Sequence, residues 1–232
     1  MEVLKQLDPM FESGTIKPAF KVAHIILALL IFEENPKGIG RYRLREKLNI
    51  SSGTARSLLK RLKENVKFID VPSDGKEISQ KVKRRGHILT EKGKEFLIKF
   101  KKKIPFIVPG NKEILKDLII NPENTEPYVC LIKNAAHNIK SGVEQRDSAI
   151  SVGGLGATCL IYDGTDIVFP SDYPRSPGIK SIKVADSIAE YLTSLALKHG
   201  VNLEKNDVLL IGLGENPELA RLVSLNAALT LI

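Results

Sequence analysis

The sequence predicts an α+β protein made of two domains, and three observations lead to this prediction. The 232 residues, 43% of them hydrophobic, are enough for a substantial core in one large or two small domains. Positive charge is concentrated in residues 1–104, which hold 24 Lys and Arg against 12 Asp and Glu, whereas residues 105–232 hold 11 against 15. Helical periodicity dominates the first part, while strand-like apolar runs alternate with helices in the second. We therefore expect a basic domain over 1–104, a linker over 105–127 and a second domain over 128–232.

The first domain is expected to be mainly helical, with two short strands near its end. In chain order the elements are helices over 19–35, 41–48 and 52–64, strands over 68–71 and 87–89, and a helix over 91–103. In the third helix Ala55, Leu58, Leu59 and Leu62 recur at i, i+3, i+4 and i+7, which predicts one buried stripe. The opposite side of that helix is therefore left to solvent or to a partner.

The second domain is expected to contain a sheet covered by helices. In chain order the elements are strands over 128–132, 149–152, 157–162, 166–169 and 207–211, and helices within 135–144, near 184–195 and from 217 onward. Asp163-Gly164 predicts a hairpin turn between two of these strands. Because a hairpin interleaves with helices, we expect a two-layer α/β sandwich with a mixed or antiparallel sheet.

The order of elements in the first domain is typical of a winged helix-turn-helix. The segments IGRYRLREKL (39–48) and SSGTARSLL (51–59) resemble the helix-turn-helix of archaeal winged-helix regulators. The segment GHILTEKG (86–93) resembles the strand-to-helix junction that closes this domain in many such proteins. The whole chain is similar to an archaeal family of transcription regulators whose second domain has no assigned function. The resemblance implies a DNA-binding regulator, acting on double-stranded DNA.

The DNA-contacting residues are expected on the outer side of the third helix, on the helix before it and in the wing. Gly53 would let the helix approach a duplex closely, and Arg56 can donate two hydrogen bonds to a guanine edge. Lysines and arginines further along would hold phosphates. The predicted contact residues are Ser51, Ser52, Gly53, Thr54, Arg56, Ser57, Lys60, Arg61, Arg41, Arg43, Lys81, Lys83, Arg84 and Arg85.

A homodimer is expected, because two half-sites on DNA sharpen discrimination and match a palindromic operator. The apolar faces of residues 19–32 and of the last helix are candidate dimer seams. Burial of both faces in the chain's own core is an equally good interpretation.

The second domain offers one weak ligand-binding pattern and little sign of catalysis. Two glycine turns and one charged pair are candidates for an effector site: Gly153, Gly154, Gly156, Gly212, Gly214, Arg146 and Asp147. Pro217 stands where the third glycine of a dinucleotide fingerprint would be, so tight turns and close packing are the stronger interpretation. An internal ion pair equally explains the charged pair.

Motifs of the common hydrolases, zinc enzymes and P-loop proteins are absent from the sequence. The four histidines are scattered, and Cys130 and Cys159 form no metal-ligand pair. We therefore expect neither an enzyme nor a metal or cofactor. The apolar run 25–32 is too short for a bilayer, which favours a cytoplasmic protein without membrane attachment. Two alternatives stay open: a small-molecule enzyme carried by a basic module, and a winged-helix adaptor for protein contacts.

Overall fold

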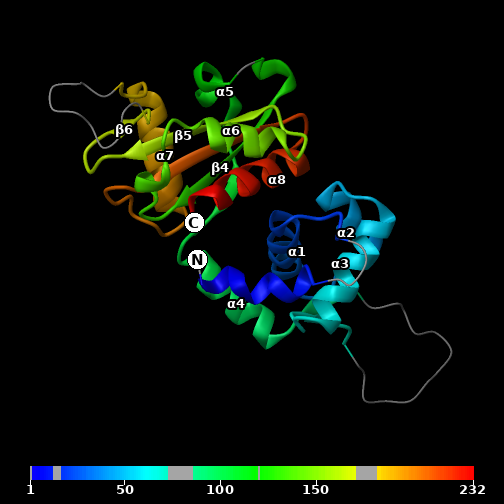
Figure 1. Cartoon of the computed structure of the whole chain (residues 1–232). Helices are drawn as coiled ribbons and strands as arrows, with labels where there is room; N and C mark the ends of the chain where they lie inside the picture. Colours follow the sequence, from blue (N-terminus) through cyan, green and yellow to red (C-terminus); the bar gives the residue numbers. More distant parts are fainter. Residues whose placement is uncertain (1, 13–16, 73–85, 120, 171–181) are drawn as a thin grey trace, which may run out of the picture. The chain divides into compact units, whose positions relative to one another are not determined.

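The contacts within the chain divide it into two compact units, Met1–Phe100 and Lys101–Ile232 (Figure 1). The computed structural model describes residues 2–12, 17–72, 86–119, 121–170 and 182–232. Each unit has its own secondary structure and its own buried residues, and each is described by itself below.

Unit 1 consists of helices and a small two-stranded sheet, and its last helix follows the second strand. Its elements are η1 (Glu2–Met10), α1 (Val22–Glu34), α2 (Arg41–Leu48), α3 (Ser52–Glu64), β1 (Ile69–Asp70), β2 (Ile88–Leu89) and α4 (Glu91–Lys101). The two strands pair antiparallel, with Ile69 opposite Leu89. The helices expected over 41–48 and 52–64 are confirmed residue for residue. Their boundaries could be predicted because Asn49, in the left-handed conformation, ends the first and Ser51 caps the second.

Helix α1 lies in the interior of the chain. Every residue from Ala23 to Phe32 is buried, and the helix packs on α2 and β2. Its apolar residues therefore serve a core. The other expected seam, α8, is likewise buried from Leu219 to Ala228 except at Arg221, and it packs on the sheet of unit 2. Among the described residues both apolar faces are buried, which agrees with the interpretation that they belong to the chain's own core.

Unit 2 is built on one five-stranded antiparallel sheet with strand order β3-β4-β7-β5-β6. Its strands are β3 (Ile107–Pro109), β4 (Glu126–Ile132), β5 (Gly156–Tyr162), β6 (Ile167–Val168) and β7 (Val208–Gly214). Its helices are α5 (Lys112–Leu115), α6 (Val143–Ile150), α7 (Asp186–Lys198) and α8 (Pro217–Ala228), with short turns η2 (Lys116–Leu118), η3 (Pro122–Asn124), η4 (Ala136–Asn138) and η5 (Leu229–Leu231). The predicted hairpin at Asp163-Gly164 is confirmed, because β5 and β6 pair across it.

Helices cover both faces of this sheet. One face, which includes Leu131 and Leu209, shares a hydrophobic cluster with Leu192 of α7 and with residues of α5. Because side chains alternate along a strand, Gly212 of β7 points to the opposite face, where α8 lies against it. The predicted two-layer sandwich is therefore wrong, since the unit has a helix layer on each side of the sheet. The sequence of β7, VLLIGLG, has no polar position, which is the pattern of a strand buried on both faces.

Two other predictions in unit 2 fail for local reasons. Residues 105–127, expected to form a linker, hold β3, α5 and the turns η2 and η3, and β3 extends the sheet by pairing with β4. Residues 149–152, expected to be extended, end α6 and continue into a turn. That helix starts after Gly142, whose φ of 79° allows the sharp entry.

Within the described residues no helix is both long and apolar enough to cross a bilayer. Cys130 and Cys159 are free thiols buried in the sheet, on strands that flank Leu210 of β7. Burial raises the pKa of the Cys159 thiol to about 12, and it raises the pKa of Cys130 as well. Both thiols therefore stay protonated near neutral pH, which suits core packing.

Candidate nucleic-acid interface

Helix α3 packs against the rest of unit 1 with one side, and its other side is exposed to solvent. Its buried residues are Ala55, Leu58, Leu59 and Leu62, and it packs against α2. At its start the Ser51 hydroxyl accepts a hydrogen bond from the Thr54 backbone N–H at 3.1 Å and lies 2.9 Å from the Thr54 hydroxyl. The Ser51 hydroxyl therefore caps α3 at the end of the turn that follows α2.

The outer side of α3 presents the residues that the sequence predicted. Gly53, Arg56 and Lys60 are exposed, and Ser57 is half-buried beside them. A Cβ on Gly53 would meet, among the described residues, only the Ser51 hydroxyl, at 3.9 Å. The fold thus gives no packing reason for a glycine at this exposed helical position, where glycine lowers helix stability.

Lys60 and Arg61 follow further along α3, and Lys60 makes the weaker contact within the protein. Its ammonium lies 3.8 Å from the Glu64 carboxylate, one turn away, and both side chains are largely exposed. Such an exposed pair is weak, so Lys60 remains able to contact a phosphate.

Arg61 has a role that the sequence did not reveal. Its Nη1 donates to the backbone carbonyl of Met10 at 2.8 Å and to that of Glu12 at 2.9 Å. Beside it, the Asn65 side chain donates to the Pro9 carbonyl at 2.8 Å. Instead of reaching for a phosphate, Arg61 joins the end of η1 to α3. No periodicity signals this contact, because η1 lies about fifty residues earlier in the chain.

A groove of about 390 Å³ runs along this part of α3. It is lined by Glu12, Ser57, Lys60, Arg61, Glu64 and Asn65. The floor and sides are therefore polar, and carboxylates lie among the basic groups. The groove therefore carries charges of both signs.

Helix α2 adds positive charge next to the start of α3. The Arg45 guanidinium donates from Nη1 to the Ser52 hydroxyl at 2.9 Å, so it ties the two helices together. The Arg41 guanidinium lies 5.2 Å from the centre of the Tyr42 ring, and Arg43 is exposed. Tyr42 is 64% exposed and was missed by the sequence reasoning, which treated α2 as a source of charge alone.

The small sheet fixes the base of the segment expected to form a wing. Lys81, Lys83, Arg84 and Arg85 lie outside the described residues. At the base, Lys63 contacts the Asp70 carboxylate at 3.0 Å, and the hydrogen bond from Lys63 lowers the pKa of Asp70. Burial lowers the pKa of His87, so this ring is neutral near pH 7.

In unit 2 the two glycine segments come together, and helix packing accounts for them. The Leu155 N–H donates to the Leu213 carbonyl at 2.9 Å. A Cβ on Gly212 would lie 2.5 Å from the Ser224 backbone, and one on Gly214 would lie 2.5 Å from the Ala220 backbone. A Cβ on Gly154 would clash with Val223 at 2.4 Å. These glycines let α8 lie directly on the sheet.

The remaining glycines of this pattern have a conformational role. Gly153 and Gly156 have φ values of 90° and 149°, which other residues rarely adopt. Arg146 and Asp147, the charged candidates, form an exposed ion pair with each other at 3.1 Å on α6. The alternative interpretation of tight turns, close packing and an ion pair thus describes what these residues do in the structure.

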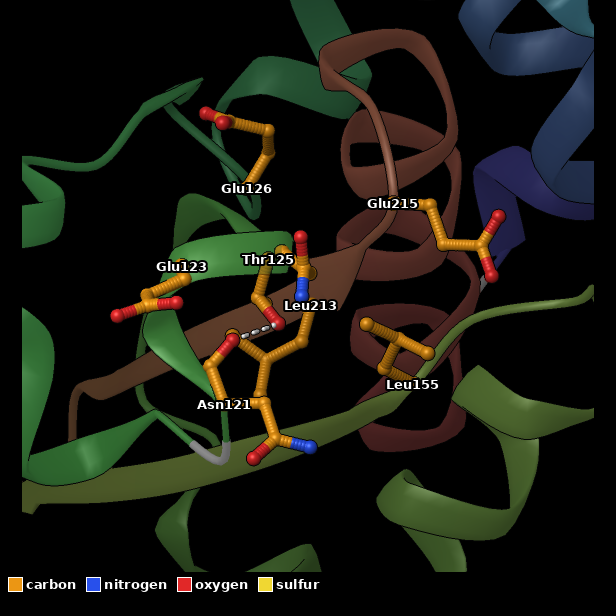
Figure 2. Close-up of a pocket in the computed structure, with 8 residues that line it drawn as sticks. Asn121, Glu123, Thr125, Glu126, Leu155, Leu213 and Glu215 are labelled. Atoms are coloured by element: carbon orange, nitrogen blue, oxygen red, sulfur yellow. Dashed lines mark hydrogen bonds between the residues drawn. The ribbon is translucent and has the colours of Figure 1, made fainter.

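An open pocket of about 550 Å³ lies beside the glycine segments (Figure 2). It is lined by Asn121, Glu123, Asn124, Thr125, Glu126, Leu155, Leu213 and Glu215. Figure 2 shows the Thr125 hydroxyl bonded to the Asn121 carbonyl, at 2.9 Å, near Leu213. Lys112 contacts the Glu126 carboxylate at 3.3 Å, which leaves two further carboxylates in the lining. A negatively charged lining disfavours a nucleotide or another phosphate ligand.

Comparison with known proteins bears on the fold. A solved structure described as the hypothetical protein PH0730 from Pyrococcus horikoshii OT3, an archaeon, is similar to this chain with a TM-score of 0.62 and 24% sequence identity. The alignment covers 91% of this chain and 93% of that one, so the likeness extends over most of both chains. None of the curated proteins matches. Residues 124–231, which hold the sheet from β4 onward and its helices, match the family described as a domain of unknown function (DUF4443).

Proposed function

We propose that this chain is a sequence-specific DNA-binding transcription regulator. Unit 1 is a winged helix-turn-helix module in this proposal, α3 is its recognition helix, and the segment between β1 and β2 is its wing. The order of elements in unit 1 supports this assignment, because α2, a tight turn, α3 and a two-stranded sheet follow one another.

One observation carries the proposal: the outer face of α3 is open and suited to a major groove. Gly53 packs against no described residue more closely than the Ser51 hydroxyl, so its missing side chain serves close approach to a partner. Arg56 is exposed one turn later on the same side, where its guanidinium can donate two hydrogen bonds to a guanine. The first turn of a recognition helix is the part that contacts base edges.

The charge around α3 supports nucleic acid over a protein partner. Arg41, Arg43 and Lys60 add positive charge beside the exposed face, and residues 1–104 have twice as many basic as acidic groups. Phosphate contacts by such residues position a protein on the duplex without reading its sequence. Arg45 acts through Ser52: its hydrogen bond positions the start of α3, so Arg45 is a positioning residue.

Selection of bound duplexes from a random pool tests this proposal. The expected result is enrichment of a short motif, followed by binding whose affinity falls steeply with salt, with a slope of about −0.9 per phosphate contacted. Repeating the selection with cell metabolites would expose an effector of unit 2. Equal binding of all duplexes would reject sequence specificity, and no binding would favour an adaptor for protein contacts.

A further inference from the structure

Helix α6 of unit 2 carries a stripe of exposed side chains that no described residue outside the stripe covers. Val143 and Ile150, at its two ends, are 46% and 51% exposed. Between them lie Arg146 and Asp147, whose side chains are 56% and 61% exposed. Positions 143, 146, 147 and 150 follow i, i+3, i+4 and i+7 spacing, so all four lie along one side of the helix. The stripe thus has a half-exposed apolar residue at each end and an oppositely charged pair in the middle.

The opposite side of α6 is fixed to α8 and to η5 by hydrogen bonds. The Gln145 amide donates to the Thr230 hydroxyl at 2.7 Å. The Asn226 amide donates to the Ser148 carbonyl at 2.8 Å, and the Ser148 hydroxyl donates to the Asn226 carbonyl at 3.1 Å. These polar contacts set the rotation of α6 about its own axis. The exposed stripe is therefore presented by a fixed scaffold.

We propose that this stripe is the surface through which two copies of the chain associate, with α6 antiparallel to its counterpart. The argument is the symmetry of the stripe itself. A two-fold axis midway between residues 146 and 147 brings Val143 opposite the partner's Ile150. The same axis brings Arg146 opposite the partner's Asp147. One patch thus complements itself in shape and in charge, as a two-fold interface requires.

The ion pair between Arg146 and Asp147 leaves atoms of both side chains able to bond to a second copy. Arg146 donates from both Nε and Nη2 to the same Asp147 oxygen, Oδ1, at 3.2 and 3.1 Å. Among the described residues, Asp147 Oδ2 and Arg146 Nη1 have no hydrogen-bond partner. In the antiparallel pair these groups meet across the axis, so that Arg146 and Asp147 of both copies form one network of four charged side chains. The opposed helix dipoles also favour the antiparallel arrangement.

The proposed interface is small, and its area limits the affinity between the two copies. An eight-residue helix covers less than the roughly 800 Å² that each partner contributes to a stable complex. Leu155, 46% exposed, does not enlarge the patch, because it lines the pocket beside Leu213 and Glu215. We therefore expect association at roughly micromolar to millimolar concentrations. This inference does not depend on DNA binding.

Sedimentation of the full chain over about 10 to 500 µM tests the surface. The wild type is expected to shift from monomer to dimer in this range. Ile150→Glu should remove the dimer, and Asp147→Arg should weaken it about tenfold by placing like charges opposite each other. Adding Arg146→Asp to Asp147→Arg should restore association, because the exchanged pair is again complementary. Leu197→Glu, on α7 and equally exposed at 56%, is the matched control that leaves the dimer intact.

Cross-linking tests the register. Because Cys130 and Cys159 are buried, new surface cysteines can be oxidised selectively with oxidised glutathione. Val143→Cys mixed with Ile150→Cys should give a disulfide-linked dimer, whereas neither variant alone should. A monomeric wild type at every concentration would overturn the proposal and leave the stripe to another protein. Equal effects of Ile150→Glu and Leu197→Glu, or cross-linking of either single variant as efficiently as the mixture, would overturn it as well.

Discussion

The Arg61 guanidinium lies 2.8 Å from the Met10 carbonyl oxygen and fastens η1 to α3. Arg61 and Arg56 lie on the same helix and both have basic side chains, yet the structure gives them different tasks. Arg61 satisfies backbone carbonyls, while Arg56 faces solvent. Substitution of Arg61 should therefore affect the stability of the fold, whereas substitution of Arg56 should affect only binding to a partner.

Arg61→Ala should lower the free energy of unfolding by about 1–2 kcal/mol, because two carbonyls lose a charged donor. Chemical denaturation of the full chain, followed by a probe in unit 1, measures this change. Arg56→Ala is the matched control and should leave stability within about 0.5 kcal/mol of the wild type. Equal stability of Arg61→Ala and the wild type would show that the contact to η1 has no energetic weight.

Gly53→Ala should make the protein slightly more stable while weakening its binding to DNA. Alanine fits the open space beside Ser51, and the helix gains about 0.5 kcal/mol from the better helix former. A methyl group at this position would separate α3 from a duplex. Thermal unfolding and a binding titration on the preferred site measure the two effects. The melting temperature should rise, and the affinity for DNA should fall.

Gly212→Ala provides the contrast for that substitution. Here the new Cβ would lie 2.5 Å from the Ser224 backbone, so the sheet or α8 must move, at a cost of about 1–3 kcal/mol. Loss of stability in Gly212→Ala with a gain in Gly53→Ala would confirm that one glycine serves packing and the other an outside partner. A loss of stability in both variants would show that Gly53 is also needed for the fold.

Stability should fall on acidification because of His24. Its Nδ1 accepts a hydrogen bond from the Lys21 N–H at 3.1 Å, and burial lowers the pKa of the ring from 6.5 to about 4. The unfolded chain takes up a proton first, so the stabilisation is complete above pH 6.5 and is lost as the pH falls toward 4. The shift corresponds to a loss of up to about 3 kcal/mol.

Unfolding free energies at pH 7 and pH 4.5 measure this effect. His24→Gln keeps an acceptor for the Lys21 N–H and removes the titrating ring, so its stability should change less between the two pH values. An identical pH dependence for the variant and the wild type would assign the acid sensitivity to other groups.

Much of the fold could be predicted because the pattern is local. The stripe Ala55, Leu58, Leu59 and Leu62, with Ser51 before it, specifies α3 without reference to the rest of the chain. The sheet layers required long-range information. The edge strand β3 has three residues, too few for a periodic signal, so the sequence alone predicts a linker there. The apolar run of β7 does indicate burial on both faces, and that signal was available.

The candidate site was predictable in part for the same reason. The exposed side of α3 follows directly from the buried stripe, and Gly53 and Arg56 are exposed as that pattern predicts. Whether a basic side chain faces solvent or a carbonyl depends on which distant segment packs beside it. Arg61 was therefore assigned to phosphate by charge alone, although η1 provides its partners.

The affinity of Arg56→Ala for the selected DNA site tests the central claim most directly. It should be measured beside Lys99→Ala, an exposed residue of α4 that removes the same charge. Arg56→Ala is expected to cost about 1–3 kcal/mol on the preferred site and to relax one base position, whereas Lys99→Ala should leave sequence preference unchanged. Wild-type affinity and preference in Arg56→Ala would contradict the assignment of α3 as the helix that reads DNA.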